Sequence, residues 1–159
     1  MFQPGDKIVH PMHGAGVVDS IVTKKVNGVT RDYYILKLPV GGMVVMIPTA
    51  TSQAIGVRPV IDATQAEKVL SAIPAISADV TLNWNQRYRE NMTRLKSGDL
   101  LEVAGVVKSL SRRDNARGLS TGERKMLHSA RQILISELVM AQGTTYEDME
   151  RRVNAALAQ

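Results

Sequence analysis

The sequence contains no cysteine among its 159 residues. This absence excludes disulfide bonds and thiolate metal ligands, and it fits a protein of the reducing cytoplasm. The chain also lacks any apolar run close to the roughly 20 residues that a membrane-spanning helix requires. Its first residues show no basic stretch followed by an apolar one, as a secretory signal would. We therefore expect a cytoplasmic protein that has no membrane partner.

Aromatic residues are also scarce, at 4% of the chain, with one phenylalanine and one tryptophan. The core must therefore consist mainly of aliphatic side chains. Hydrophobic residues make up 44% and charged residues 22%, which is ordinary for a folded protein and argues against a disordered chain. The length allows one domain or two small ones.

Basic residues outnumber acidic ones by 20 to 15, which gives a net charge of +5 and an isoelectric point near 9.7. The excess is concentrated in residues 84–131, which hold eleven basic and five acidic side chains, whereas residues 60–83 and 132–159 are both net negative. Such a block is typical of proteins that bind a polyanion. For any single basic residue, a solvated helix face is the simpler interpretation.

The first 57 residues show the patterns of short strands and turns. Asn27-Gly28 is a strong hairpin signal because both positions tolerate positive φ. Gly14-Ala15-Gly16 is interpreted as a turn. Five short strands in this segment predict a small, strongly bent antiparallel barrel. The clearest β-prone stretches are residues 7–10, 17–22, 32–38 and 43–47.

From about residue 62 the apolar spacing becomes helical. Possible capping boxes at residues 120–123 and 144–147 mark two helix starts. The fold class is therefore α+β, with an antiparallel β-barrel over residues 1–58 and an all-α domain over residues 62–159. The predicted helices are residues 63–73, 83–96, 99–117, 120–141 and 144–157, and residues 75–81 are interpreted as a linker.

Trp84 carries the strongest functional signal in the sequence. It begins the predicted helix 83–96 and, on a 3.6-residue period, shares a face with Arg87, Tyr88 and Asn91. One interpretation is an indole that anchors the helix to the core. The other is a ring that stacks against nucleobases while nearby cations bind phosphates. Spacing alone leaves both open.

Two other features allow alternative functions. His10 and His13 form an HxxH pattern, but zinc sites need three or four ligands, and the proline and glycine around the pattern indicate a loop. We find no nucleophile and base with a recognisable spacing, so we expect no enzyme, no metal and no cofactor. The long strands at residues 22–26 and 33–38 alternate as core strands do, but one of them could present an open edge to a partner.

Several stretches match a known sequence pattern, namely residues 2–16, 33–36, 47–48 and 56–58 in the first half, and residues 84–89 and 118–127 in the second. These stretches resemble the CarD/CdnL family of bacterial transcription regulators. The resemblance covers nearly the whole chain in order, whereas the barrel alone also resembles the polymerase-interacting domain of the transcription–repair coupling factor.

The resemblance implies a Tudor-like barrel that binds the β subunit of RNA polymerase and a helical domain that contacts promoter DNA at the upstream edge of the melted region. It also implies that the tryptophan wedges into the minor groove and stabilises the open complex. The implied DNA-contacting residues are Trp84, Arg87, Arg89, Met92, Arg124 and Lys125, and the implied polymerase-facing residues are Lys24, Val26, Tyr34 and Met46.

The chain departs from the family pattern at two positions. Gln86-Arg87 stands where members often have two basic residues, and Met46 stands where some have arginine. The second departure removes a charge from the electrostatic part of the polymerase interface, whereas strand addition uses backbone groups and does not depend on that side chain. We expect a monomer, since no heptad pattern predicts a stable dimer. As a protein that contacts promoter DNA, it is also expected to associate with the nucleoid.

Three alternatives remain at this point. The chain could be a general architectural protein of the minor groove without a polymerase partner. It could be an RNA-binding protein, since small bent barrels also occur in translation proteins. It could also be a metal-dependent enzyme that uses His10 and His13.

Overall fold

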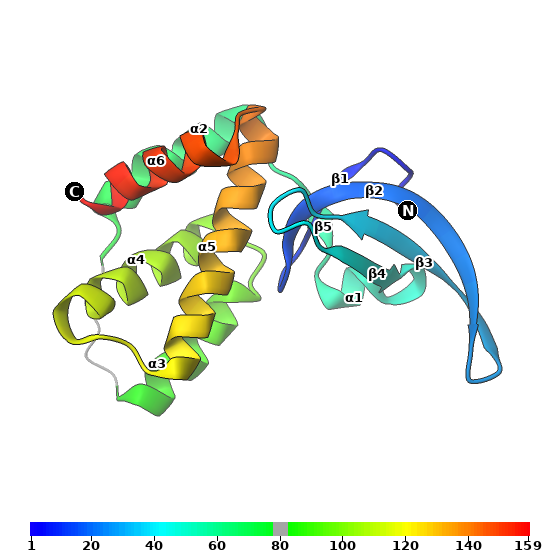
Figure 1. Ribbon diagram of the computed structural model, residues 1–159, viewed down its shortest axis with the longest axis horizontal. Helices are drawn as coiled ribbons and strands as arrows, with labels where there is room; N and C mark the ends of the chain where they lie inside the picture. Colours follow the sequence, from blue (N-terminus) through cyan, green and yellow to red (C-terminus); the bar gives the residue numbers. More distant parts are fainter. Residues whose placement is uncertain (78–82) are drawn as a thin grey trace.

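The computed structural model describes residues 1–77 and 83–159, which form a barrel part and a helical part (Figure 1). The barrel part consists of β1 (Lys7–His10), β2 (Gly14–Val26), β3 (Val29–Lys37), β4 (Val44–Pro48), the short helices η1 (Thr49–Thr51) and α1 (Ser52–Ile55), and β5 (Arg58–Pro59). The helical part consists of α2 (Ala63–Ala72), η2 (Ile73–Ala75), α3 (Trp84–Leu95), α4 (Leu100–Arg117), α5 (Thr121–Gln142) and α6 (Tyr146–Leu157). This α+β architecture confirms the predicted fold class.

The strands form one antiparallel sheet in the order β4-β3-β2-β1-β5. Asn27 and Gly28 turn β2 into β3 with φ angles of 49° and 78°, as the hairpin signal predicts. A bulge between Val18 and Ser20 shifts the pairing register of β2 with β3. Bulges bend a strand and increase its twist, and the long hairpin curves strongly away from the rest of the barrel (Figure 1).

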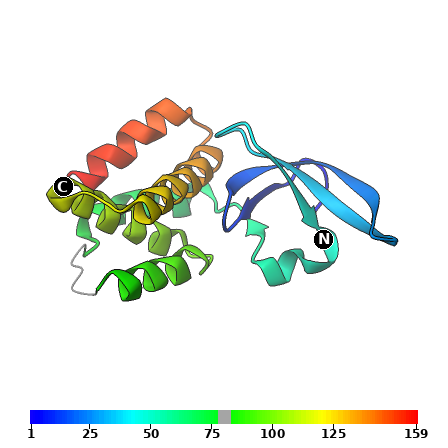
Figure 2. The same cartoon turned by 60° about the horizontal axis from the view of Figure 1, so that its bottom comes forward.

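The helical part packs around α5, which is the longest helix among the described residues. Residues 103–110 of α4 and residues 133–138 of α5 are buried on every face, so these segments lie in the centre of the core. The core is aliphatic, as the low aromatic content predicts. Figure 2 shows the helices beside the bent sheet of the barrel.

The structure corrects several predicted boundaries. Gly14-Ala15-Gly16 is the beginning of β2 rather than a turn, and residues 49–55 are helical, which the sequence analysis missed. The cap of α6 is Thr145, whose side chain accepts a hydrogen bond from the Asp148 amide, one residue later than predicted. Of the predicted linker, Ala75 belongs to η2, and residues 78–81 lie outside the described residues.

Candidate polymerase and nucleic-acid interfaces

Trp84 lies in the first turn of α3 and is partly exposed, at 43% of its surface. Its indole Nε1 donates a hydrogen bond to Ser120 Oγ at 3.0 Å. Its ring also stacks on Tyr88, with centroids 5.1 Å apart and planes 18° apart. The indole is therefore neither sealed in the core nor free to rotate, and a large part of its surface is open to a ligand.

Residues at the beginning of α5 lie close to this ring. Ser120 caps α5, because its hydroxyl also accepts a hydrogen bond from the Glu123 amide at 3.2 Å. A Cβ atom at Gly122 would lie 3.7 Å from Trp84 Cζ2 and 3.7 Å from Tyr88 Cε2, so the glycine backbone runs close to both rings. We call Trp84, Tyr88, Ser120 and Gly122 the indole platform.

Arg87 does not lie on the exposed side of α3, where a phosphate contact would require it. It is only 4% exposed, and its Nε and Nη2 donate to the Glu123 carboxylate at 2.7 and 3.1 Å. The hydrogen bond with Glu123 raises the pKa of Arg87. Glu123 is itself 1% exposed, and a buried carboxylate requires a paired cation. In this structure Arg87 therefore joins α3 to α5.

Residues 84–131, which hold the excess of basic side chains and which we call the positive block, contain a second buried cation. Lys108 is 2% exposed and donates from Nζ to the Ile73 and Pro74 carbonyls, both at 2.8 Å. Burial, and to a lesser degree the charge of Arg112, lowers the pKa of Lys108. The amine holds the end of η2, so the positive block is not one continuous charged surface.

Three of the expected DNA-contacting cations are exposed, namely Arg89, Arg124 and Lys125. Arg124 Nη2 donates to the Leu119 carbonyl at 3.3 Å, which holds the guanidinium near the start of α5 and thus near the indole platform. Arg89 lies on the outer face of α3. Met92 is half-buried and packs against the helical core, so it supports α3 more than it offers contact area.

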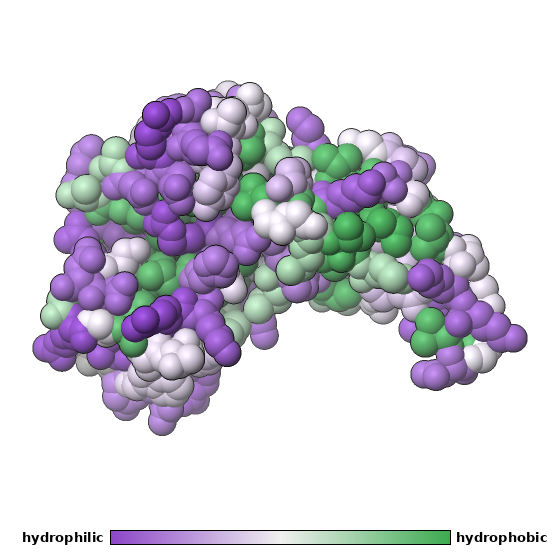
Figure 3. Space-filling model, viewed as in Figure 1, coloured by the Kyte–Doolittle hydropathy of each residue, from purple (hydrophilic) through white to green (hydrophobic). Residues whose placement is uncertain are grey.

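The barrel presents an apolar face to solvent. Residues directly opposite one another in an antiparallel sheet point to the same side. The pairings place Lys24 with Arg31, Val26 with Val29, and Met46 with Ile35 on the side away from the barrel core. Exposed apolar residues on this side are Val26 and Val29 at 47%, Val44 at 56% and Met46 at 40%, and Figure 3 shows apolar atoms gathered over part of the barrel. We call this side the sheet face.

Tyr34 does not belong to the sheet face, in contrast to its expected polymerase-facing role. It is 1% exposed and lies in the barrel core with Ile21 and Ile47 as cross-strand partners. Its hydroxyl accepts a hydrogen bond from the Phe2 amide at 3.1 Å, and the two rings meet edge to face. Because side chains alternate along β3, the neighbouring Tyr33 points to the sheet face instead. The sequence alone could not tell which of the two adjacent tyrosines points outward.

Of the two strands that could present an open edge, residues 22–26 have a free side and residues 33–37 do not. Residues 33–37 of β3 pair with β2 on one side and β4 on the other, so they offer no free edge. Among the described residues, the hairpin region has three free edges: β4, residues 29–32 of β3 on the side away from β2, and residues 19–26 of β2 on the side away from β3. Strand addition could use only these edges.

His10 and His13 form part of a turn. Their ring centroids lie 4.6 Å apart, and His10 Nδ1 accepts a hydrogen bond from the Met12 amide at 3.0 Å. Burial, followed by the charge of His13, lowers the pKa of His10 to about 4. Within residues 1–77 and 83–159, no group of three or more histidine, aspartate or glutamate side chains could hold a metal ion. No helix in the same residues is long and apolar enough to cross a membrane.

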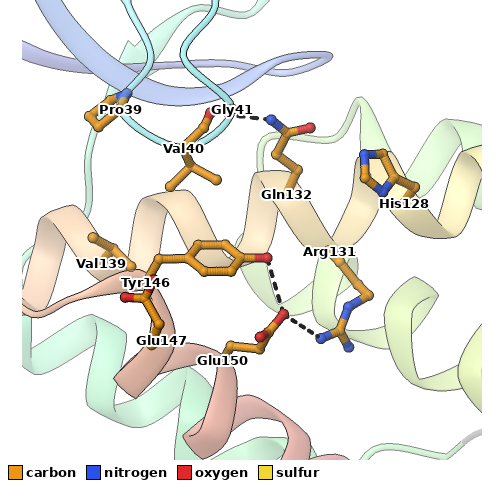
Figure 4. Close-up of a pocket in the computed structure, with 10 residues that line it drawn as sticks. All are labelled: Pro39, Val40, Gly41, His128, Arg131, Gln132, Val139, Tyr146, Glu147 and Glu150. Atoms are coloured by element: carbon orange, nitrogen blue, oxygen red, sulfur yellow. Dashed lines mark hydrogen bonds and ion pairs between the residues drawn. The ribbon is translucent and has the colours of Figure 1, made fainter.

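A cavity of about 680 Å³ lies between the β3–β4 loop and helices α5 and α6 (Figure 4). Two of its charged residues, Arg131 and Glu150, form an ion pair. The Tyr146 hydroxyl donates to Glu150 Oε2 at 3.2 Å, and Arg131 Nη2 lies 3.6 Å from the same oxygen. Burial is the main reason why the pKa of Tyr146 is raised. None of the residues of the indole platform lines this cavity.

The chain is thus a two-part α+β protein, in which a barrel with an apolar sheet face is joined to helices that carry an indole among cations. The comparisons agree with this class. The CarD-like/TRCF RID domain model matches residues 2–61, and the CarD C-terminal domain model matches residues 68–154. In Bacillus subtilis (strain 168), the protein named "Putative transcription factor YdeB" is 37% identical over 150 residues, covering 94% of this chain and 98% of that protein.

The chain therefore belongs to the CarD family of transcription factors, which confirms the resemblance seen in the sequence. Membership in this family makes the chain a transcription regulator that interacts with RNA polymerase.

Proposed function

We propose that the barrel docks on the β subunit of RNA polymerase, and that the helical part stabilises the open promoter complex through Trp84 in the minor groove at the upstream edge of the melted DNA. The main support for this proposal is the fixed and partly exposed position of the Trp84 side chain. The indole is 43% exposed, yet its Nε1 is bonded to Ser120 and its ring is stacked on Tyr88. A ring fixed in this way loses little conformational entropy when it meets a base.

The proposed effect requires different affinities for melted and closed DNA. A ligand that binds both states equally shifts nothing, whereas one that prefers the open state shifts the equilibrium toward it. An indole stacks on an unstacked base step but finds no such partner in an intact duplex. Aromatic stacking on a base contributes roughly 1–3 kcal/mol, and about 1.4 kcal/mol corresponds to a factor of ten in an equilibrium constant.

The exposed cations near the platform support the same proposal. Arg124 and Lys125 lie in the first turn of α5, where the helix N-terminus also favours anions. Phosphate contacts from these residues and Arg89 would orient the platform without reading the sequence. Arg87, which pairs with Glu123, contributes to this model by holding α3 against α5.

The sheet face is the part of the barrel that we assign to polymerase. Exposed apolar patches on monomeric proteins mark interaction sites, and Lys24, Val26 and Met46 all lie on this face. The free edges of β2 and β4 border it, so an added strand and side-chain contacts can act together.

The test is the lifetime of the open complex on a promoter whose open state is unstable. Trp84→Ala should shorten this lifetime by about tenfold, because stacking of roughly 1–3 kcal/mol is lost, and should leave polymerase binding unchanged. Leu101→Ala is the matched control, since Leu101 is a similarly exposed apolar residue of α4, at 38%. An unchanged lifetime with Trp84→Ala would exclude the wedge. Equal binding to duplex and forked DNA would favour a general architectural role instead.

A further inference from the structure

One helix connects the two interfaces of the protein. The first turn of α5 carries Ser120 and Gly122 of the indole platform at its N-terminal end. Its C-terminal half packs against the barrel (Figure 1). A helix of 22 residues is about 33 Å long and is stiff over that length. Any change in how the barrel is attached to α5 would therefore move the indole.

The strongest attachment is an ion pair between Glu137 of α5 and Arg58 of β5. Glu137 is fully buried, at 0% exposure. Its two carboxylate oxygens accept from Arg58 Nη1 at 2.7 Å and Nη2 at 2.6 Å, and Oε2 also accepts from the Ile61 amide at 3.0 Å. A bidentate guanidinium fixes direction as well as distance. We call Arg58, Ile61 and Glu137 the latch.

Further contacts along the same helix face fix the rotation of the barrel. Ser136 Oγ accepts from the Ala15 amide at 2.9 Å, and a Cβ at Gly14 would lie only 2.6 Å from that hydroxyl, so β2 lies directly on α5. One turn earlier, Gln132 Nε2 donates to the Val40 carbonyl at 3.2 Å (Figure 4). These contacts come from separate segments of the barrel, so they oppose rotation of the barrel about any single contact.

We propose that Arg58 and Glu137 are positioning residues that lock the docked barrel to α5 and so determine where the indole platform stands over the DNA. This inference rests on the proposed function, because it assumes that the barrel docks on polymerase and that Trp84 acts on the promoter. With a loosened latch, the indole platform would stay tethered near the DNA but would no longer have a fixed orientation. Restoring this orientation on binding would then cost conformational entropy.

Two variants weaken the latch to different degrees. Glu137→Gln removes the carboxylate charge and leaves Arg58 with a single acceptor in place of two. Arg58→Lys keeps the charge but cannot form the bidentate pair with the carboxylate. It replaces Glu137→Gln in the experiment if that variant does not fold. Val153→Ala is the matched control for stability, because Val153 is a buried residue of α6 that belongs to the helical core and not to the latch.

The first measurement combines each latch variant with Trp84→Ala in a double-mutant cycle on open-complex lifetime. We expect the latch variants to shorten the lifetime by about tenfold while polymerase affinity stays within about twofold, and Trp84→Ala to add less than about twofold in the latch background. Val153→Ala should leave the lifetime unchanged. A merely structural latch would instead give additive effects, and this result would overturn the inference.

The cycle also separates failure of the inference from failure of the proposed function. If Trp84→Ala has no effect in the wild-type background, the proposed function fails. If Trp84→Ala shortens the lifetime but the latch variants do not, only the inference fails. If the latch variants abolish polymerase binding, the latch serves the barrel itself, and the inference is also overturned.

The second measurement reports the position of the barrel relative to the helical part. Since the chain has no cysteine, Thr30→Cys on the hairpin and Asn115→Cys on α4 provide two exposed sites for spin labels. The distance distribution between these labels should be narrow in the otherwise unchanged protein and clearly broader with Arg58→Lys. An equally narrow distribution in both would overturn the latch.

Discussion

At the indole of Trp84, neighbours from two helices act on one side chain. Tyr88 of the same helix covers one side of the ring, and Ser120 at the start of α5 holds its Nε1. An aromatic pair contributes about 0.5–1.5 kcal/mol beyond area burial, and a hydrogen bond adds about 1 kcal/mol. Neither is large, but together they exceed thermal energy and favour one ring orientation in the free protein.

Ser120→Ala should therefore loosen the indole. The variant removes the acceptor of the Nε1 hydrogen bond and also the cap of α5, which costs about 0.5–2 kcal/mol in stability. Because Trp84 is the only tryptophan, its fluorescence reports the change directly: anisotropy should fall and acrylamide quenching should rise. Ser120→Thr keeps a hydroxyl for both bonds and should behave like the unchanged protein. If Ser120→Ala alters stability but not the fluorescence, the hydroxyl acts only as a cap.

The residue scale is also where sequence reasoning reached its limit. The position of Trp84 among cations made it a candidate for contact with nucleic acid. The partner of Arg87 did not, because Glu123 lies 36 residues away in the chain and meets it only through the packing of α3 on α5. In the sequence Glu123 reads as a capping-box residue, since nothing local reveals that its carboxylate turns toward a distant guanidinium.

At the scale of elements, one bulge decides which side chains the barrel shows to solvent. Val17 faces Lys37, but beyond the bulge Ser20 faces Ile35, so the odd-numbered residues before it and the even-numbered residues after it share one side of β2. The sequence predicted the strands and the Asn27-Gly28 turn because these signals are local. It could not predict the bulge, which depends on how β2 pairs with β1 and β3.

The sheet face gives a prediction for polymerase binding. Val26→Asp combined with Met46→Asp should weaken binding by at least about tenfold, because an apolar side chain buried at an interface contributes about 1.5–3 kcal/mol. Both residues are exposed in the free protein, so its thermal stability should change little.

Thr30→Asp is the control for that double variant, because Thr30 is exposed on the same hairpin but points to the opposite side. Equal loss of binding in the control and the double variant would indicate a general charge effect. Retained binding in the double variant would exclude the sheet face as the docking surface.

At the scale of the whole molecule, we expect the barrel to depend on the helical part for its stability. Its buried core cluster contains only a few residues, among them Ile8, Leu36 and Ile47, and so small a core supplies little free energy of folding by itself. Part of its burial comes from α5 instead, against which Gly14 and Ala15 are packed. The two sequence segments could be recognised separately from composition and periodicity, but this dependence could not, because it arises from contacts across the boundary.

The described contacts between the two parts therefore predict one cooperative unfolding transition. Heating should give coincident curves for Trp84 fluorescence, which reports on the helical part, and for the emission of a long-wavelength dye attached through Thr30→Cys on the hairpin, which reports on the barrel. Gly14→Val should separate them, because a Cβ there meets Ser136 Oγ at 2.6 Å and Gly14 has a φ of 103°. The barrel should then unfold first, while the helical part keeps its aliphatic core. Two transitions in the unchanged protein would mean that the parts fold independently, and the contacts on α5 would then be too weak to hold the indole at a fixed distance from the docking surface.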